Sequence, residues 1–185
     1  EEAELPVFRE LTGREEPPTK PATEAWIVAG RRSAKSRKSA TIGVYLATIG
    51  AELAGWRDSL APGERGIVLI MAIDKRQAGV TLEYAAALFR EVPVLKGLIE
   101  RETSEGIELT NGMALIVLAN DFRAIRGRTL VACIMDEVSY WRNELTVSPD
   151  VEVYRAAKPA LATTPGSLMI GISSPYRRAG LLWRK

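Results

Sequence analysis

The stretch Ala25–Ser36 constrains the fold of this chain more than any other part of the sequence. It begins with a short apolar run, continues through Gly30 and small residues, and ends in Lys35 and Ser36. The apolar run predicts a buried strand, the glycine predicts a tight loop, and the last two residues begin a helix. This succession of strand, loop and helix is the layout of a phosphate-binding P-loop.

A P-loop holds a triphosphate with its backbone N–H groups and the positive end of the following helix. Here Lys35 would reach the outer phosphates, and the Ser36 hydroxyl would be a ligand of Mg²⁺. The two glycine positions of the pattern G-x-x-x-x-G-K-[ST] hold Ala29 and Ala34, which keep the N–H donors but add a Cβ. A basic surface at a strand–helix turn is the alternative interpretation. The predicted phosphate-binding residues are Gly30, Arg31, Arg32, Ser33, Ala34, Lys35 and Ser36.

The composition excludes several kinds of site. The chain of 185 residues has no histidine and one cysteine, which excludes Ser-His-Asp triads, Cys-His dyads, Cys/His zinc sites and internal disulfides. Any metal must therefore be held by oxygen atoms, which suits Mg²⁺. Cys133 lies in an apolar run, which predicts a buried thiol. The net charge of +2 indicates no particular partner.

Four short apolar runs predict a mostly parallel sheet. They alternate with helical patterns and are each followed by polar residues, which is typical of a parallel α/β sheet with helices on both faces. The predicted fold class is therefore α/β, a P-loop NTPase with a mostly parallel central sheet flanked by helices. The polar strand ends are expected to gather at one edge, beside the P-loop. The predicted strands are Ala25–Ala29, Ile67–Ala72, Leu130–Met135 and Leu168–Ile172.

The segments around these strands predict helices, one hairpin and a leader. Asn111-Gly112 between two apolar runs predicts a type I′ turn, and Pro159 is expected to kink or shorten its helix. The proline-rich residues 1–24 are expected to pack, with one helical turn, on a domain formed by residues 25–185. No apolar run reaches the roughly 18 residues of a membrane helix, and no signal peptide is evident. The predicted helices cover residues 35–51, 74–90, 94–101 and 150–163, with another beginning near 177.

Asp136 and Glu137 follow an apolar strand in the manner of a Walker B motif. The first carboxylate would hold Mg²⁺, and the second would orient and deprotonate the attacking water. Adjacent acidic residues also favour the start of a helix, which is the alternative interpretation. The position of this pair downstream of a P-loop favours the catalytic interpretation.

Phosphoryl transfer also needs a cation against the charge that develops on the γ-phosphate. Arg31 and Arg126 are the candidates. For both, the alternative is a structural ion pair or a surface charge unrelated to phosphate. Ser173 and Ser174 follow the last predicted strand. They would place a hydroxyl near the γ-phosphate or, alternatively, form a turn before Pro175.

Together these motifs resemble the large terminase subunit, the DNA-packaging motor of tailed bacteriophages. The resemblance covers essentially the whole chain, and an arginine inside the P-loop is typical of terminases. It is carried by segments 8–14 (Phe-Arg-Glu-Leu-Thr-Gly-Arg), 29–36 (the P-loop), 61–66 (Ala-Pro-Gly-Glu-Arg-Gly), 74–78 (Asp-Lys-Arg-Gln-Ala), 122–127 (Phe-Arg-Ala-Ile-Arg-Gly), 135–137 (Met-Asp-Glu) and 173–175 (Ser-Ser-Pro).

The resemblance implies an ATPase domain of the ASCE type, which uses ATP and Mg²⁺ to drive double-stranded DNA into a procapsid. By position, the resemblance assigns Arg31 to sensing the γ-phosphate and Glu137 to general-base catalysis. It assigns Ser173 and Ser174 to coupling hydrolysis with movement. The P-loop residues and Asp136 keep the roles given above.

The resemblance also implies partners. The family works in the host bacterial cytoplasm as a ring on the portal protein, usually pentameric, with a small terminase subunit. Large terminases carry a C-terminal nuclease domain, whereas this chain stops at Lys185, so no nuclease activity is expected from it. Gln77 is the only glutamine and lies after the P-loop, so the adenine-contacting glutamine of many terminases has no counterpart. The segment 8–14 is expected to take that role.

Two alternatives differ in function class. A degenerate P-loop module that binds DNA or packaging partners with little ATP turnover is favoured by Ala34. Another P-loop NTPase, such as a helicase or a small-molecule kinase, is the other alternative. The pair Asp136-Glu137 disfavours a kinase, which has no need to activate water, and a helicase would need motor motifs in a second domain.

Overall fold

One seven-stranded sheet organises the part of the chain that the computed structural model describes, which comprises residues 4–141 and 148–185. The strand order is β1-β7-β6-β2-β5-β4-β3. The first five strands in this order are parallel to their neighbours, and β4 and β3 are antiparallel. The strands are β1 (Glu24–Val28), β2 (Gly66–Ala72), β3 (Ile99–Glu102), β4 (Gly106–Leu109), β5 (Met113–Ala119), β6 (Leu130–Asp136) and β7 (Leu168–Ser173). The predicted mostly parallel α/β sheet is confirmed.

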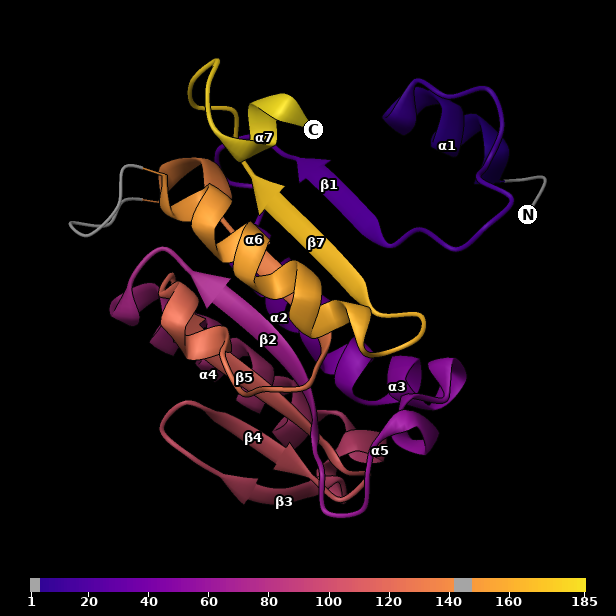
Figure 1. Cartoon of the computed structure of the whole chain (residues 1–185), viewed down its shortest axis with the longest axis vertical. Coiled ribbons are helices and arrows are strands. Elements are labelled where there is room, and N and C mark those ends of the chain that lie inside the picture. The colour runs from indigo at the N-terminus through magenta and orange to yellow at the C-terminus, as the bar shows by residue number, and fades with distance from the viewer. Residues whose placement is uncertain (1–3, 142–147) are drawn as a thin grey trace.

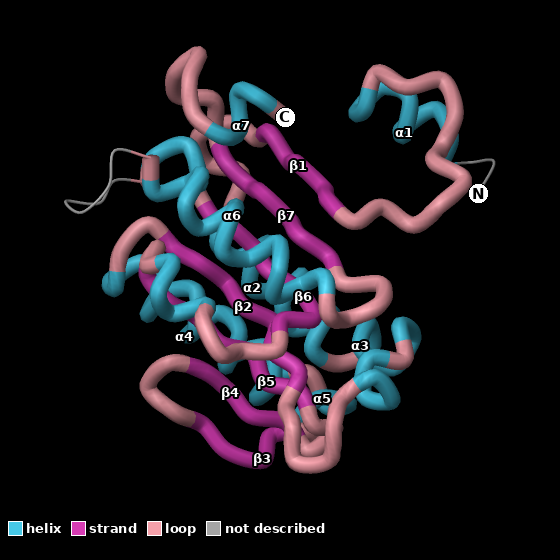
Figure 2. The backbone as a smooth tube through the Cα atoms, viewed as in Figure 1, coloured by secondary structure: helices cyan, strands magenta, loops and turns pink. Residues whose placement is uncertain are grey.

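Helices cover both faces of this sheet (Figures 1 and 2). One hydrophobic core joins α2 and α4 to one face, and a second core joins α6 and α7 to the other. No helix of the described residues is long and apolar enough to cross a membrane. The α-helices are α1 (Leu5–Thr12), α2 (Lys35–Ala47), α3 (Ile49–Ala54), α4 (Lys75–Glu91), α5 (Pro93–Lys96), α6 (Pro149–Ala162) and α7 (Leu181–Arg184), with 3-10 turns η2 (Trp56–Ser59), η3 (Phe122–Ile125) and η4 (Val138–Tyr140).

The central strands are apolar along their whole length because both of their faces are covered by helices. All seven residues of β6 are buried, and Cys133 is fully buried among them as predicted. Burial raises the pKa of the Cys133 thiol to about 12, so this group is an inert part of the core. The strand β7 lies between β1 and β6, so the P-loop strand and the Asp136 strand are neighbours of one common strand.

Strand β1 differs from its prediction as a buried strand, because it forms an edge of the sheet. Its last two residues, Ile27 and Val28, are 40% and 61% exposed. At its first residue, Glu24 accepts hydrogen bonds from Lys158 and Tyr154, which lie on α6. Burial alone would raise the pKa of Glu24, but the hydrogen bonds to its carboxylate lower it to about 2. This network ties the strand that leads into the P-loop to the helix on its face.

The hairpin β4–β5 forms where it was predicted, but its turn is not of type I′. Its loop has three residues, and within it only Gly112 has a positive φ, of 82°. The amide of Gly112 donates to the carbonyl of Leu109, as in a type I turn that is followed by a left-handed glycine. Asn111 instead uses its side chain, which donates to the carbonyl of Ala47 and accepts from the amide of Met113.

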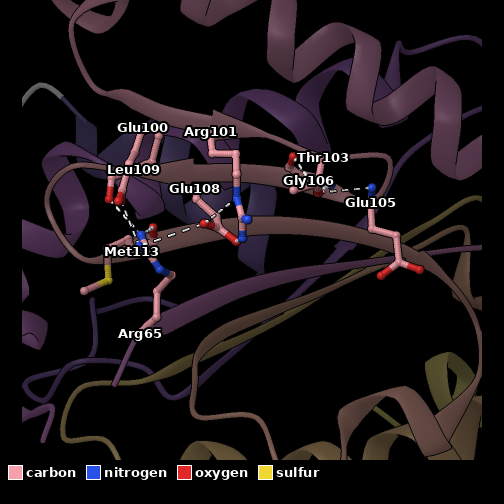
Figure 3. A network of polar contacts seen from close by, with 9 residues as sticks. All are labelled: Arg65, Glu100, Arg101, Thr103, Glu105, Gly106, Glu108, Leu109 and Met113. Atoms are coloured by element: carbon pink, nitrogen blue, oxygen red, sulfur yellow. Dashed lines mark hydrogen bonds and ion pairs between the residues drawn. The ribbon is translucent and has the colours of Figure 1, made fainter. Parts of the chain in front are cut away.

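Strand β3 is the largest correction to the secondary structure, because the sequence predicted a helix over residues 94–101. The helix α5 ends at Lys96, and the chain then pairs with β4 as an edge strand held by charged side chains (Figure 3). The predicted helix over residues 35–51 is also divided, since Thr48 breaks the helical backbone between α2 and α3. Helix α6 runs through Pro159, which is exposed, so this proline does not shorten it.

The leader forms a helix at the predicted place, but that helix stands apart from the sheet. Helix α1 includes the expected turn and buries none of its residues. Figure 1 shows it beyond β1, joined to that strand by an extended segment. The packing of the leader on the domain is therefore not seen in the described residues.

Candidate active site

The P-loop connects the carboxyl end of β1 to α2. The amide of Ala29 donates to the carbonyl of Ser173, which extends the pairing of β1 with β7 by one residue. The chain then turns through Arg32 and Ala34, which have φ values of 122° and 56°. Ala34 occupies the left-handed region directly before α2, where glycine is the least strained residue. This conformation explains why the usual pattern has glycine at that position.

Lys35 is buried at the start of α2 and is held by two oxygen atoms. Its Nζ donates to the carbonyl of Gly30 at 2.9 Å and lies 3.3 Å from Oε1 of Glu137. The side chain of Lys35 is only 6% exposed. A buried ammonium group is stable only where it is paired. The loop therefore positions this cation between the P-loop backbone and the predicted general base.

Asp136 ends β6 as a fully buried carboxylate. Within the described residues, neither of its oxygen atoms has a hydrogen-bond partner of regular geometry. Burial raises the pKa of Asp136, while the hydroxyls of Ser36 and Ser39 and the charge of Lys35 act to lower it. A buried carboxylate without a partner is costly, and a metal ion is one way to compensate it.

Glu137 directly follows Asp136 and turns away from it. Its backbone lies in the left-handed region, with a φ of 53°. Its Oε2 accepts from the hydroxyl of Ser173 and from the amide of Ser174, both at 3.3 Å. The amide of Ser139 in turn donates to the hydroxyl of Ser173. The two neighbouring carboxylates are thereby separated, one toward the P-loop hydroxyls and one toward the end of β7.

Backbone strain is concentrated at this site. In the described part of the chain, the non-glycine residues with positive φ are Arg32, Ala34 and Glu137. Each such conformation costs about 1–3 kcal/mol and is retained where the surroundings enforce it. All three belong to the two predicted motifs, the P-loop and the Walker B pair.

A cleft of about 830 Å³ lies between the P-loop and α4, and the predicted site residues Gly30, Asp136 and Ser173 are not among those that line it. The P-loop contributes every residue from Arg31 to Ser36, and Glu137 and Ser174 line the opposite side. For Arg31 and Arg32, both exposed, no partner is seen within residues 4–141 and 148–185. A wall of α4 that includes Tyr84 and Leu88 extends the cleft beyond the P-loop.

Arg126 lies away from this cleft and from the other predicted site residues. It lies between η3 and β6, in a separate pocket beside α6, together with Arg128 and Arg155. The reason is that η3 packs on α6, on the sheet face opposite to α2 and α4. Arg126 therefore cannot act on the P-loop of its own chain in this arrangement.

Two residues of the site were missed by sequence reasoning. The side chain of Ser39, one turn after Lys35, is fully buried and faces Asp136. Gln77, in the first turn of α4, donates from Nε2 to Oγ of Ser36 at 2.8 Å. The available signals were the helical spacing from Lys35 for the serine and, for the glutamine, its place at the carboxyl end of a parallel strand.

The donor set fits Mg²⁺. A hydroxyl from Ser36 and an orphaned carboxylate from Asp136 are hard oxygen ligands, and the carboxylate is buried without a partner among the described residues. Magnesium keeps several of its water molecules and usually needs only one or two protein ligands. Ser36 and Asp136 are therefore sufficient protein ligands for a hydrated ion bound together with a triphosphate.

Solved structures of phage large terminases have a fold similar to that of this chain. The large terminase of bacteriophage HK97 superposes with a TM-score of 0.59 at 19% identity, over 88% of this chain and 31% of that protein. The large terminase ATPase domain of Thermus phage P74-26 superposes with a TM-score of 0.57 at 20% identity, over 96% of this chain and 70% of that domain. No protein-family profile and no curated protein sequence matches the chain.

At these identities the likeness establishes the fold, which is that of terminase ATPase domains. The chain spans about a third of the length of the HK97 protein.

Proposed function

We propose that this chain is the ATPase motor domain of a phage large terminase, which hydrolyses ATP with Mg²⁺ to drive double-stranded DNA into a procapsid. The observation that carries the proposal is the contact between Lys35 and Glu137 at one cleft, beside the buried carboxylate of Asp136, on a fold shared with terminase ATPase domains. These groups supply a phosphate-binding cation, a metal ligand and a general base.

The contact between Lys35 and Glu137 suggests the order of events. In the structure the ammonium group contacts the carboxylate of Glu137. When a triphosphate binds, Lys35 turns to its outer phosphates, and the carboxylate is freed to accept a proton from the attacking water. Ser36 and Asp136 would hold Mg²⁺, which supplies positive charge to the phosphate oxygens. Arg31, at the mouth of the loop, would sense the γ-phosphate.

The serines at the end of β7 would couple hydrolysis to movement. Ser173 and Ser174 both donate hydrogen bonds to the carboxylate of Glu137. Any change in the charge or position of that carboxylate would therefore alter the hydrogen bonds at the end of β7. The segment after β7 leads to α7, which packs on η4, so a shift at this point would be transmitted along the chain.

Arg126 would act in trans, on the cleft of a neighbouring subunit in a ring. Its position on the opposite sheet face supports this, because it does not line the cleft of its own chain. Mixing two inactive variants tests the idea. Lys35→Ala lacks a working site and Arg126→Ala lacks the finger, so their mixture should regain hydrolysis, whereas a finger in cis would leave the mixture inactive.

The remaining parts of the proposal concern the assembled motor. The chain would work in the host cytoplasm as a homo-oligomeric ring, with a pentamer as the expected form. Its partners would be double-stranded DNA, the portal protein and a small terminase subunit. The structural neighbours are large terminases, which supports a role in packaging. Nuclease activity is not part of the proposal for this chain.

ATP binding and hydrolysis by the parent chain, with and without Mg²⁺, test the proposal. We expect Mg²⁺-dependent binding that is lost in Lys35→Ala and kept in Lys38→Ala, a matched control with an exposed lysine on the same helix. A parent chain that binds no ATP in the presence of Mg²⁺ would overturn the proposal. Binding with no detectable turnover, at concentrations where the chain assembles, would instead favour the degenerate P-loop module.

A further inference from the structure

Gln77 makes the contact at the cleft that the P-loop and Walker B motifs do not explain. It belongs to α4, which follows β2, and its Nε2 donates to Oγ of Ser36 at 2.8 Å. Forty-one positions separate the two residues along the chain. The contact therefore joins the predicted metal ligand to a helix that contributes none of the P-loop or Walker B residues.

The backbone of Gln77 is fixed, so its side chain is presented at a defined place. Its amide donates to the carboxylate of Asp74 at 2.7 Å, which caps the start of α4. Its carbonyl accepts from the hydroxyl of Thr81, which is fully buried. Helices α2 and α4 also pack directly on one another. A side chain on such a support can hold its partner in one orientation.

The hydroxyl of Ser36 has one proton and two lone pairs. The amide of Gln77 occupies one lone pair. One lone pair then remains for a metal ion. Gln77 therefore orients the hydroxyl and leaves a lone pair for a metal ion, as groups around a metal ligand commonly do.

We infer that Gln77 is a positioning residue for the metal-binding hydroxyl of Ser36, and that through it the occupancy of the metal site is linked to α4. The inference rests on the proposed function, because it concerns the metal that accompanies the nucleotide. Gln77 itself touches neither the metal nor the phosphates in this role. Loss of the Gln77 side chain should weaken the Mg²⁺ dependence of nucleotide binding. It should leave the affinity of the P-loop for the phosphates unchanged in the absence of Mg²⁺.

Equilibrium binding of a fluorescent ATP analogue tests this, titrated with Mg²⁺ and repeated in excess chelator. Gln77→Met removes the donor at nearly constant volume, and Glu83→Met, on an exposed position of the same helix, is the matched control. We expect the half-saturating Mg²⁺ concentration to rise about tenfold in Gln77→Met, as for other groups that orient metal ligands. Affinity in chelator should stay at the parental value, and the control should match the parent in both conditions.

Two results would overturn the inference. One is an unchanged Mg²⁺ dependence in Gln77→Met. The other is an equal loss of affinity with and without Mg²⁺, because a merely structural contact would affect both. If the methionine variant does not fold, Gln77→Ala takes its place, since alanine favours the helix. Failure of the proposed function is distinguishable, because the parent chain would then bind no nucleotide even with Mg²⁺.

Discussion

Two regions with several charged side chains, the hairpin edge and the cleft, are organised in opposite ways. At the hairpin edge, Arg65 donates to the carbonyls of Leu109 and Met113 and forms an ion pair with Glu100 at 2.8 Å (Figure 3). Beside it, the guanidinium group of Arg101 donates hydrogen bonds to both carboxylate oxygen atoms of Glu108. At the cleft, by contrast, the carboxylate of Asp136 has no partner of regular geometry among the described residues, and the backbone is strained at three positions.

We therefore assign the charged groups of the hairpin to stabilising the fold and those of the cleft to binding a ligand. The hairpin network satisfies its groups within the chain, and its charged edge strand also discourages pairing with other sheets. Beside the cleft, by contrast, the buried carboxylate of Asp136 has no hydrogen bond of regular geometry among the described residues and the backbone is strained, as is common at ligand-binding sites. Substitutions should therefore affect activity at the cleft and stability at the hairpin.

The largest expected effect on activity is that of Asp136→Asn. We expect Mg²⁺-dependent ATP hydrolysis to fall at least about 100-fold, because the metal contributes several kcal/mol to phosphoryl transfer. The same variant should be more stable without metal by about 1 kcal/mol, since a buried unpaired charge is removed. Hydrolysis rates and urea unfolding curves measure the two effects. A variant that loses stability as well as activity would mean that Asp136 is a structural residue.

The pH dependence of stability also tests whether the buried carboxylate of Asp136 destabilises the metal-free protein. Burial raises the pKa of Asp136 above its ordinary value of 3.8. In the pH window between the ordinary and the raised pKa, the metal-free native state therefore binds more protons than the unfolded state. The contribution of this group to stability should therefore fall as pH rises through the window and stay lost above it. Asp136→Asn should lack this decrease in urea unfolding across the acidic range. Identical profiles for variant and parent would contradict it.

At the hairpin, Arg65→Ala should show the opposite pattern. We expect a loss of about 2 kcal/mol in the free energy of unfolding, because two partly buried carbonyls and Glu100 lose a charged donor. Nucleotide affinity should not change. Arg90→Ala, which removes an exposed pair with Glu102, is the control and should cost less than about 1 kcal/mol. Altered nucleotide affinity in Arg65→Ala would break the separation of the two regions.

The smallest expected effect is that of Ala34→Gly, which releases strain at the cleft. A glycine adopts the left-handed backbone at this position without the cost that alanine carries, which is about 1 kcal/mol. Stability should rise by a similar amount, and nucleotide binding should be kept or improved. Thermal unfolding and nucleotide titration measure both. A destabilised variant would show that the Ala34 side chain makes a favourable contact instead.

The central strands and the P-loop could be predicted from the sequence because the pattern of each lies within a few consecutive residues. The runs that became β2, β6 and β7 are uniformly apolar, and their polar ends do meet at the cleft. Strand β3 was missed because Ile99–Glu102 is short and charged, and pairing with β4 rather than its own pattern makes it a strand.

The rest of the site depends on contacts between distant segments, which no local pattern states. Gln77 meets Ser36 only because α4 packs beside α2. Arg126 lies close to Asp136 in sequence, but η3 packs on the far face of the sheet and carries it away from the cleft. The position of β1 at the edge of the sheet follows from the strand order. An apolar run predicts a strand but does not show whether that strand is central or at an edge.

The central claim is that Glu137 acts as the general base of an ATPase, and Glu137→Gln tests it most directly. ATP binding and hydrolysis should be measured side by side, with Glu91→Gln, another glutamate that lines the cleft, as the matched control. We predict that hydrolysis falls by about 100- to 10,000-fold while Mg²⁺-dependent binding is kept, because only proton transfer is removed. Hydrolysis at the parental rate in Glu137→Gln would contradict the claim.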